Sequence, residues 1–164
     1  MNQNATAVNS IILYDTLTGL YNRQYLKIKF RELRTIKERL GINVSMIMID
    51  INNFRTVNDA SGYEAGNQLL VDFADICRMN TRKDFDFVFR VGGDEFLILT
   101  LDSSLDECED ICQRVNRQIA KQVSHLSISY GITQVDTRVE LSTCIDECDR
   151  KLTDYKLRLS NTLS

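Results

Sequence analysis

Residues 85–101 read Phe-Asp-Phe-Val-Phe-Arg-Val-Gly-Gly-Asp-Glu-Phe-Leu-Ile-Leu-Thr-Leu. Two apolar runs, 85–91 and 95–101, flank a Gly-Gly-Asp step. Because both glycines can adopt positive φ, a Gly-Gly step between two such runs is typical of a β-hairpin. The stretch therefore predicts two antiparallel strands joined by a tight turn that presents Asp94 and Glu95.

Apolar periodicity on both sides of this hairpin predicts the remaining elements. Residues 44–50 form a nearly continuous apolar run and predict a central strand, and alternation over 126–132 predicts a further strand. Helices are predicted over 22–40, 66–80, 105–122 and 141–159. The middle of the chain then has the order β-α-β-β-α-β, the ferredoxin-like split. We expect an α+β fold with a mainly antiparallel central sheet, helices covering one face, and additional N- and C-terminal helices.

Length and composition restrict the class of protein. The chain has 164 residues, of which 43% are hydrophobic, and this fits one folded domain. We assign that domain to 15–164, with residues 1–14 as a helical stub or linker from an upstream domain. The net charge of −3 argues against binding to nucleic acid. Without a run of about 18 apolar residues or a secretory leader, we expect a cytoplasmic domain with no direct membrane insertion.

Five cysteines, an odd number, favour reduced thiols over disulfides. Four of them form two C-x-x-x-C pairs, at 108 and 112 and at 144 and 148. This spacing puts both sulfurs of a pair on one helix face. A zinc site is the alternative interpretation, but the flanking apolar residues favour buried thiols that pack like small hydrophobic side chains.

Three carboxylates are expected to converge at one end of the predicted sheet. In the ferredoxin-like split the first and third strands are adjacent, so Asp50 should lie beside Asp94 and Glu95. Such carboxylates raise one another's pKa unless a cation neutralises them, and hard oxygen ligands suit Mg²⁺. From spacing alone, a metal site for chemistry at phosphorus and an ordinary acidic surface hairpin are equally favoured.

Several segments resemble the motifs of one known family, the GGDEF domain, which is the catalytic domain of diguanylate cyclases. Gly92–Phe96 is the stretch that gives the family its name. Other segments resemble further family motifs in the same order, namely D-x-L-T-G-L-x-N-R at 15–23, D-I-D-x-F-K-x-x-N-D at 50–59, G-H-x-x-G-D at 62–67, S-x-G at 129–131 and A-D-x-A-L-Y-x-A-K at 148–156. The resemblance covers about 15–161, nearly the whole chain.

This resemblance implies a fold like that of nucleotidyl cyclases and polymerase palm domains. It implies a transferase that condenses two GTP into cyclic di-GMP, a bacterial second messenger, with release of two pyrophosphates. Two domains would face each other as a homodimer, with Mg²⁺ or Mn²⁺ as cofactor, two ions per GTP. It further implies a role in signal transduction under an upstream sensory domain.

The resemblance also assigns roles to individual residues. Metal ligands would be Asp50, the Ile51 carbonyl, Asp94 and Glu95. Asp94 would also be the general base, and Glu95 and Arg55 would complete the catalytic set. Substrate would bind through the backbone at Asn53 and Phe54 and through Asn58, Tyr63, Asn67 and Lys156.

Some positions depart from the family pattern. The family's second Asp is Asn52, its Lys is Arg55 and its His is Tyr63. The usual Gly-Arg-Asn near the C-terminus is Leu159-Ser160-Asn161, so a phosphate-binding Arg is missing. The inhibitory R-x-x-D motif reads Lys83-Asp84-Phe85-Asp86, and we therefore do not expect feedback inhibition by product at that site.

Two alternatives to a diguanylate cyclase stay open. Asn67 replaces the Asp that accepts hydrogen bonds from guanine, and an Asn side chain can pair with adenine through one donor and one acceptor. This favours a relative that forms cyclic GMP-AMP. The accumulated departures instead favour a degenerate, non-catalytic GTP-binding signalling module.

Overall fold

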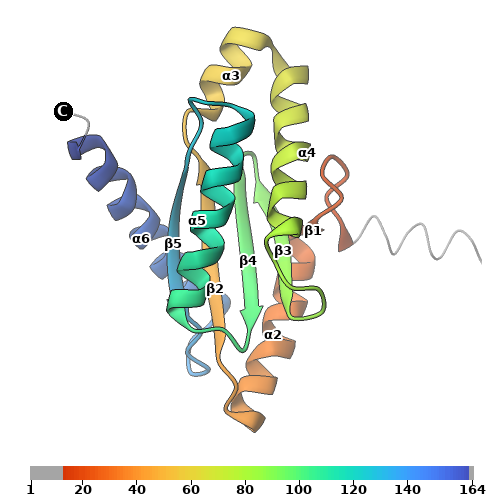
Figure 1. Cartoon of the computed structure of the whole chain (residues 1–164). Coiled ribbons are helices and arrows are strands. Elements are labelled where there is room, and N and C mark those ends of the chain that lie inside the picture. The colour runs from red at the N-terminus through yellow and green to blue at the C-terminus, as the bar shows by residue number, and fades with distance from the viewer. Residues whose placement is uncertain (1–12, 163–164) are drawn as a thin grey trace, which may run out of the picture.

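The hairpin predicted over 85–101 lies within a five-stranded sheet (Figure 1). The computed structural model describes residues 13–162. The strands follow the order β1-β3-β4-β2-β5, with the bounds β1 (Tyr21–Asn22), β2 (Val44–Ile51), β3 (Asp86–Gly92), β4 (Glu95–Leu101) and β5 (Ile128–Gln134). Strand β2 runs antiparallel to β4 and β5, β3 runs antiparallel to β4, and β1 pairs with β3 in parallel. The predicted adjacency of the first and third core strands, β2 and β4, is confirmed.

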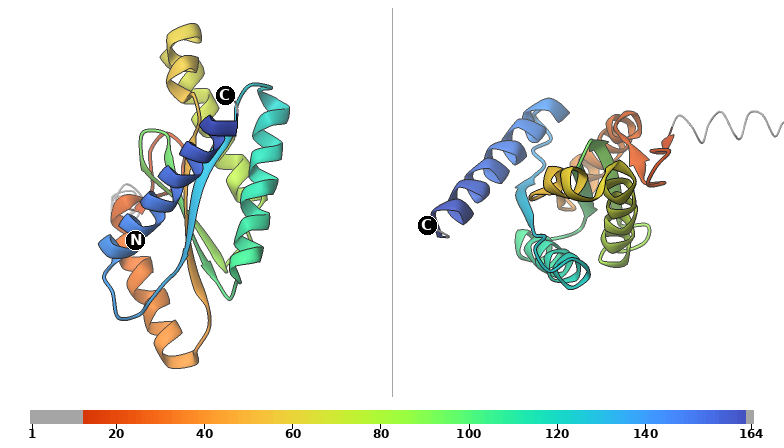
Figure 2. Two further views of the ribbon diagram at one scale, coloured as in Figure 1. Left: turned by 90° about the vertical axis from the view of Figure 1, so that its left-hand side faces the viewer. Right: turned by 90° about the horizontal axis from the view of Figure 1, so that it is seen from above.

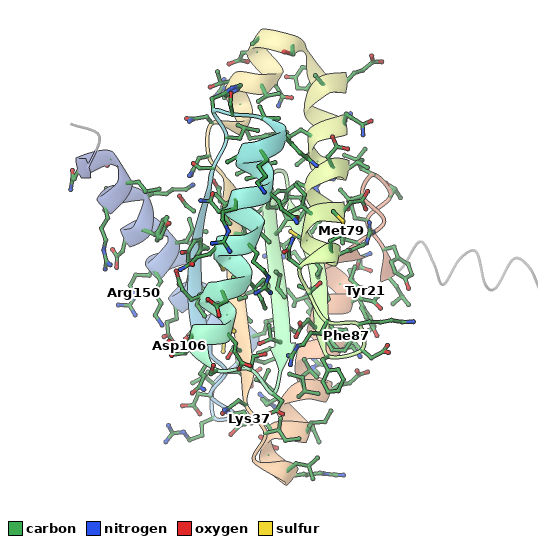
Figure 3. All side chains as sticks on the ribbon, viewed as in Figure 1. Tyr21, Lys37, Met79, Phe87, Asp106 and Arg150 are labelled. Carbon is green, nitrogen blue, oxygen red and sulfur yellow. The ribbon has the colours of Figure 1, made fainter. Side chains whose placement is uncertain are left out.

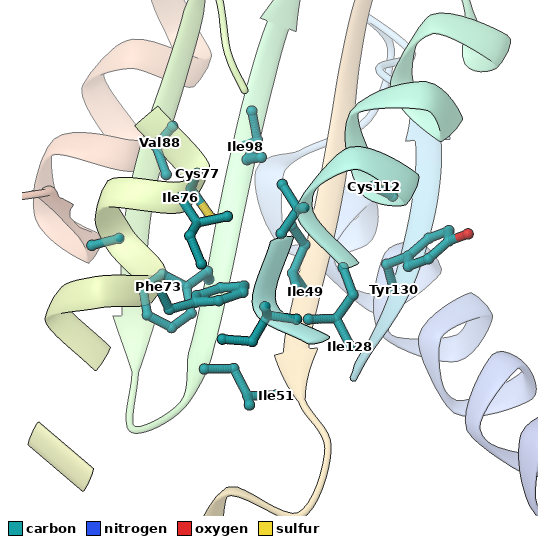
Figure 4. Close-up of a cluster of buried hydrophobic side chains, with 14 of the residues drawn as sticks. Ile49, Ile51, Phe73, Ile76, Cys77, Val88, Ile98, Cys112, Ile128 and Tyr130 are labelled. Atoms are coloured by element: carbon teal, nitrogen blue, oxygen red, sulfur yellow. The ribbon is translucent and has the colours of Figure 1, made fainter. Parts of the chain in front are cut away.

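Helices cover both faces of this sheet. They are α2 (Arg23–Leu40), α3 (Phe54–Ser61), α4 (Tyr63–Met79), α5 (Leu105–Gln122) and α6 (Leu141–Thr162). Helices α4 and α5 cover one face, where Phe73 and Cys112 pack with Ile49 (Figure 4). Helices α2 and α6 cover the opposite face, where Phe30 and Leu152 pack with the alternate residues of β2 (Figure 2).

The core helices α4 and α5 cover one face as expected, and the additional terminal helices α2 and α6 cover the other face, a placement that the sequence did not predict. The physical reason lies in β2, whose first six residues are all buried. A strand with consecutive buried residues is covered on both sides, because successive side chains point to opposite faces. The terminal helices α2 and α6 supply the second layer.

Capping residues set the ends of α2 and α5. The Asn22 side chain accepts hydrogen bonds from two backbone N–H groups of the first turn of α2, each at 3.0 Å. Gly41 ends that helix in a left-handed conformation with φ 70°, which costs a glycine little. Ser104 and Glu107 form a capping box at the start of α5. Helix α5 spans the predicted 105–122.

Several local details differ from the predictions, since periodicity predicts neither α3 nor β1, and α6 runs to Thr162 rather than to residue 159. Helix α4 begins at Tyr63 rather than at residue 66. Gly62 precedes it with φ 85°, a non-helical conformation that ends α3 and separates the two helices. Strand β5 begins two residues later than predicted. Of the two hairpin glycines, Gly93 alone has positive φ, at 27°. Gly92 ends β3, paired with Glu95 after a register shift that follows Arg90.

The cysteines are free and buried, as predicted. Cys108 and Cys112 of α5 pack on one face of the sheet, and Cys144 and Cys148 of α6 pack on the other. Burial raises the pKa of the Cys148 thiol to about 12. The sheet separates the two C-x-x-x-C pairs, so they do not combine into one four-sulfur site.

Charged side chains cover the outer helix surfaces. Asp106 on α5 and Arg150 on α6 are exposed and point away from the sheet (Figure 3). Within residues 13–162, no helix has the length and apolar character needed to span a bilayer.

Candidate functional site

Asp50 lies at the end of β2, beside the turn between β3 and β4. It is the cross-strand partner of Glu95 on β4 and of Ser129 on β5. Directly opposed residues of antiparallel strands have Cβ atoms about 5 Å apart. Asp94 precedes Glu95 in the turn and is half-buried. The fold therefore brings the three predicted carboxylates to one end of the sheet.

Lys156 of α6 neutralises Asp50 in this structure. The Lys156 Nζ lies 2.8 Å from Asp50 Oδ1. Burial raises the pKa of Asp50, and the charges of Asp94 and Asp149 raise it further, whereas the hydrogen bond and charge of Lys156 lower it; the pKa remains above its ordinary value. A cation beside Asp50 would offset the nearby charges of Asp94 and Asp149.

The three carboxylates do not form a finished ligand set. Over residues 13–162, no three His, Cys, Asp or Glu side chains are gathered closely enough to hold a metal ion. Glu95 instead lines a cavity of about 220 Å³ beneath α2 and α6, together with Asp149. The available donors are still hard oxygens, the carboxylates and the Ile51 carbonyl, and these fit Mg²⁺. A divalent ion would compete with Lys156 for Asp50.

A second cavity, of about 420 Å³, opens between the ends of β2, β5 and α6. Its lining consists of Asp50, Asn52, Asn53, Ser127, Ser129, Lys156, Leu159 and Ser160. Ammonium, amide and hydroxyl groups suit an anionic ligand rich in oxygen, such as a phosphate. Asn53 has φ 61° and its side chain makes no cap hydrogen bond to α3. Its carbonyl accepts from the Thr56 N–H at 3.0 Å, so Thr56 is the residue of the first turn whose N–H group Asn53 engages.

Asn52, which departs from the family pattern, is held by two serines. Its Nδ2 donates to Ser127 Oγ at 2.9 Å, and its Oδ1 accepts from Ser129 Oγ at 2.8 Å. The amide therefore ties the end of β2 to the edge strand β5. Sequence reasoning missed Ser127. The signal that points to it is its spacing of two residues from Ser129, which puts both side chains on one face of an extended segment.

The predicted base-binding residues lie on α3 and α4, which extend beyond the end of the sheet (Figure 1). Asn58 packs against Gly66, where an added Cβ would lie 1.8 Å from Asn58 Oδ1. Asn67 follows Gly66 on α4 and is exposed, and Tyr63 is 81% exposed. Arg55 is exposed on the first turn of α3. Arg55, Tyr63 and Asn67 are open to solvent, Asn58 is half-buried, and none of the four lines the two cavities that hold Asp50 and Glu95.

The degenerate inhibitory motif has a structural role. The Asp86 side chain is fully buried, and Arg82 Nη2 lies 2.8 Å from its Oδ1. Arg82 also donates to the Leu101 carbonyl at 2.7 Å and to Ser103 Oγ at 2.6 Å. The pair closes the loop between α4 and β3 against the end of β4, so Arg82 is already engaged within the chain.

The strand order and the helices that cover the sheet give the palm-like nucleotidyl-cyclase fold. The model of the family described as "Diguanylate cyclase, GGDEF domain" matches residues 12–162. The chain belongs to this family.

Curated relatives support the assignment. The chain is 30% identical over 147 residues to "Diguanylate cyclase DgcS" of Shewanella oneidensis, covering 88% of this chain and 49% of that protein. It is 36% identical over 93 residues to "Diguanylate cyclase DosC" of Escherichia coli K12, covering 57% of this chain and 20% of that protein. The chain thus spans half or less of the length of these relatives.

Solved structures show the same fold. Diguanylate cyclase SiaD from Pseudomonas aeruginosa, in complex with its activator SiaC, superposes with a TM-score of 0.83 at 27% identity, covering 94% of this chain and 62% of that one. The coiled coil and GGDEF domain of DgcB from Caulobacter crescentus, in complex with c-di-GMP, gives a TM-score of 0.85 at 18% identity, covering 94% and 85%.

Proposed function

We propose that this chain is the catalytic domain of a diguanylate cyclase that condenses two GTP into cyclic di-GMP as a homodimer. The observation that carries the proposal is the half-buried Asp50, paired with Lys156 at the mouth of the polar cavity and beside the Asp94–Glu95 turn. The carboxylates, which would attract a cation, lie beside a polar cavity that would accept a triphosphate. Family membership and the named relatives support the same reaction.

In the proposed reaction Asp94 takes the proton from the 3′-hydroxyl of its own GTP. That oxygen forms a bond to the α-phosphorus of the GTP on the partner domain, and the bond between the α- and β-phosphates breaks to release pyrophosphate. Asp50, the Ile51 carbonyl, Asp94 and Glu95 would hold Mg²⁺ or Mn²⁺, two ions per GTP. The bound ions would neutralise phosphate charge and polarise the α-phosphate.

Other residues bind and orient the nucleotide in this proposal. Lys156 and Arg55 offer positive charge to the triphosphate, and the first-turn N–H groups of α3, at Asn53 and Phe54, offer hydrogen bonds to it. Asn58 and Asn67 contact the base, with Tyr63 at the rim. Arg55 differs from the family Lys in shape but keeps the charge.

A turnover assay tests the reaction. Purified protein is incubated with GTP and Mg²⁺, and the products are separated and identified. We expect cyclic di-GMP and pyrophosphate, and neither when the metal is chelated. Calorimetry with GTP should show tighter binding with Mg²⁺ than without it. Equal affinity in both conditions contradicts the metal site, and GTP binding without turnover supports the non-catalytic signalling module.

Asn67 motivates the second candidate, synthesis of cyclic GMP-AMP. Guanine offers two donors at this position, and the exposed Asn67 amide can accept one of them but presents its own donor to the other. In an equal mixture of GTP and ATP, a mixed product supports this candidate. Asn67→Asp should then shift synthesis to cyclic di-GMP and lower the KM for GTP about tenfold, the effect of regaining one hydrogen bond. Unchanged product and KM contradict a role for Asn67 in base choice.

We further propose that the domain acts in the cytoplasm under an upstream sensory domain. The stub predicted at residues 1–14 lies mostly outside the described residues. The greater length of the named relatives supports additional domains in the whole protein.

A further inference from the structure

One guanidinium joins the N-terminal turn to the turn that carries Asp94 and Glu95. Arg90 Nε and Nη2 donate to the carbonyl of Gly93 at 2.9 and 2.8 Å. Arg90 Nη1 donates to Asp15 Oδ1 at 3.1 Å. The two charged side chains are largely buried, with 15% of the Arg90 and 23% of the Asp15 side chain exposed. Solvent screening of the pair is therefore weaker than for a surface ion pair.

Asp15 is itself rigidly held. Its Oδ1 accepts from the backbone N–H of Thr18 at 2.9 Å and from Thr18 Oγ1 at 2.7 Å. Its backbone N–H donates to the Leu20 carbonyl at 2.7 Å, and its carbonyl accepts from the Gly19 N–H at 2.9 Å. The carboxylate that orients Arg90 thus belongs to a closed turn at the start of the domain, only two residues after the first described residue.

Arg90 contacts the hairpin where its own strand pairing is irregular. The register of β3 and β4 shifts between Arg90 and Gly92, so the backbone ladder is interrupted just before the turn. Gly93 follows with φ 27° and is exposed. Two hydrogen bonds from Arg90 hold the Gly93 carbonyl, and the bond from Arg90 to Asp15 joins this turn to the N-terminal turn.

We propose that Arg90 is a positioning residue that holds the 93–95 turn in its active placement, and that Asp15 sets the geometry of Arg90. A conformational change that reaches the N-terminal turn from the preceding chain would then be passed to Asp94 and Glu95 through the Arg90 side chain. Arg90 touches no reacting group in this scheme. The proposal rests on the proposed cyclase function for its effect on turnover, but its effect on the turn is independent of that function.

The experiment compares Arg90→Lys with Arg82→Lys. Both changes shorten an arginine side chain that is ion-paired with an aspartate. Arg90 is largely buried, whereas 46% of the Arg82 side chain is exposed, and Arg82 contacts Asp86, Leu101 and Ser103 rather than the turn. Lysine keeps the charge and cannot bridge two acceptors in the same planar geometry. The readouts are amide hydrogen exchange at residues 93–95, kcat and KM for GTP, and the thermal midpoint.

We expect Arg90→Lys to speed exchange at 93–95 and to lower kcat, each by about tenfold, the effect of losing a hydrogen bond from a charged group. Asp15→Asn should act in the same direction, and the double variant should be no worse than Arg90→Lys alone. Arg82→Lys should lower the thermal midpoint and leave exchange at 93–95 and kcat within about twofold of the wild type, a typical effect for a change away from a site.

Unchanged exchange at 93–95 in Arg90→Lys overturns the proposal. So does an equal loss of kcat in Arg90→Lys and Arg82→Lys, because that pattern reports stability alone. A wild-type chain without turnover contradicts the proposed function instead, and exchange at the turn then decides the role of Arg90 by itself.

Discussion

Asp50 and Asp94 are the residues on which the proposed chemistry depends most directly. Replacing either by Ala removes a carboxylate from a strand end or a turn rather than from the core, so the fold should persist. We expect turnover to fall by about a hundredfold or more, the lower end for a positioned acid–base group, with an unchanged circular dichroism spectrum.

Asp75→Ala is the matched control for these two variants. Asp75 pairs with Arg78 at 2.7 Å on the surface of α4, with 59% of its side chain exposed. It lies outside both cavities described above. Turnover should be close to that of the wild type. Full activity in both Asp50→Ala and Asp94→Ala would place the chemistry elsewhere.

Asp15 should make stability depend on pH. Burial raises the pKa of Asp15, but hydrogen bonds from Thr18 and Arg90 outweigh it and leave the pKa below its ordinary value. A carboxyl group whose pKa is lower in the folded state stabilises the fold above its unfolded pKa of about 3.9, and this contribution is lost as pH falls through the folded value. The charged side chain that faces it is Arg90 of β3, while Arg78 of α4 binds the neighbouring Thr18 carbonyl.

Denaturant unfolding of the wild type and Asp15→Asn at several pH values tests this dependence. The wild type should be the more stable protein near neutral pH, and the difference in free energy of unfolding should shrink as the pH falls below about 4. A constant difference from pH 7 to pH 3 would show that the Asp15 charge does not contribute.

Individual motif positions could be predicted from the sequence, but their partners could not. Asp15 and Arg90 are 75 residues apart, and Asn52 meets Ser127 across the same separation. No local periodicity encodes such pairs, because they depend on how strands align in the finished sheet. The same limit applies to Lys156. The resemblance implied its role in substrate binding, but the sequence did not predict its contact with Asp50.

The junction of α3 and α4 offers a test of how packing between elements serves the site. Gly66→Ala places a Cβ 1.8 Å from Asn58 Oδ1, so the Asn58 side chain must move. The change also improves helix propensity by about 1 kcal/mol, which offsets part of the strain. We expect a protein that folds with near-normal thermal stability but binds GTP about tenfold more weakly, the loss of one base hydrogen bond.

Gly131→Ala is the contrasting variant. Its Cβ would lie 2.0 Å from the Cys148 carbonyl, a backbone atom of α6 that cannot rotate away. Overpacking of this kind costs about 1–3 kcal/mol, so thermal stability should fall. If Gly66→Ala lost stability as Gly131→Ala does and kept its GTP affinity, Asn58 would not be a base contact.

At the scale of elements, sequence periodicity predicted helices and strands well but not the second helical layer. The apolar run at 44–50 indicated a central strand, and its unbroken character already required cover on both faces. Helices α2 and α6 provide that cover. The face of the sheet on which α2 and α6 pack depends on how the chain connects them to the core strands. The order of elements along the sequence does not determine these connections.

The whole molecule carries one nucleotide half-site in the proposed reaction, so two chains must meet. Two reacting centres need to come within about 3–3.5 Å, and one chain offers a single Asp50, Asp94 and Lys156 constellation. The net charge of −3 provides little electrostatic attraction or repulsion to guide that encounter. Activity should therefore depend on protein concentration in a way that binding of GTP does not.

We expect turnover per chain to rise across a hundredfold range of protein concentration, in parallel with the dimer fraction measured by sedimentation, because the dimer forms by mass action. Fusing a short dimeric coiled coil ahead of Ser10 should raise turnover at low concentration by increasing the effective concentration of the second half-site. The same fusion carrying Asp94→Ala is the control, since it dimerises without a general base and should stay inactive. The two-chain reaction is contradicted if turnover per chain stays constant over this range while sedimentation shows only monomer. A monomer holds one half-site, and a constant rate would require both half-sites within one particle.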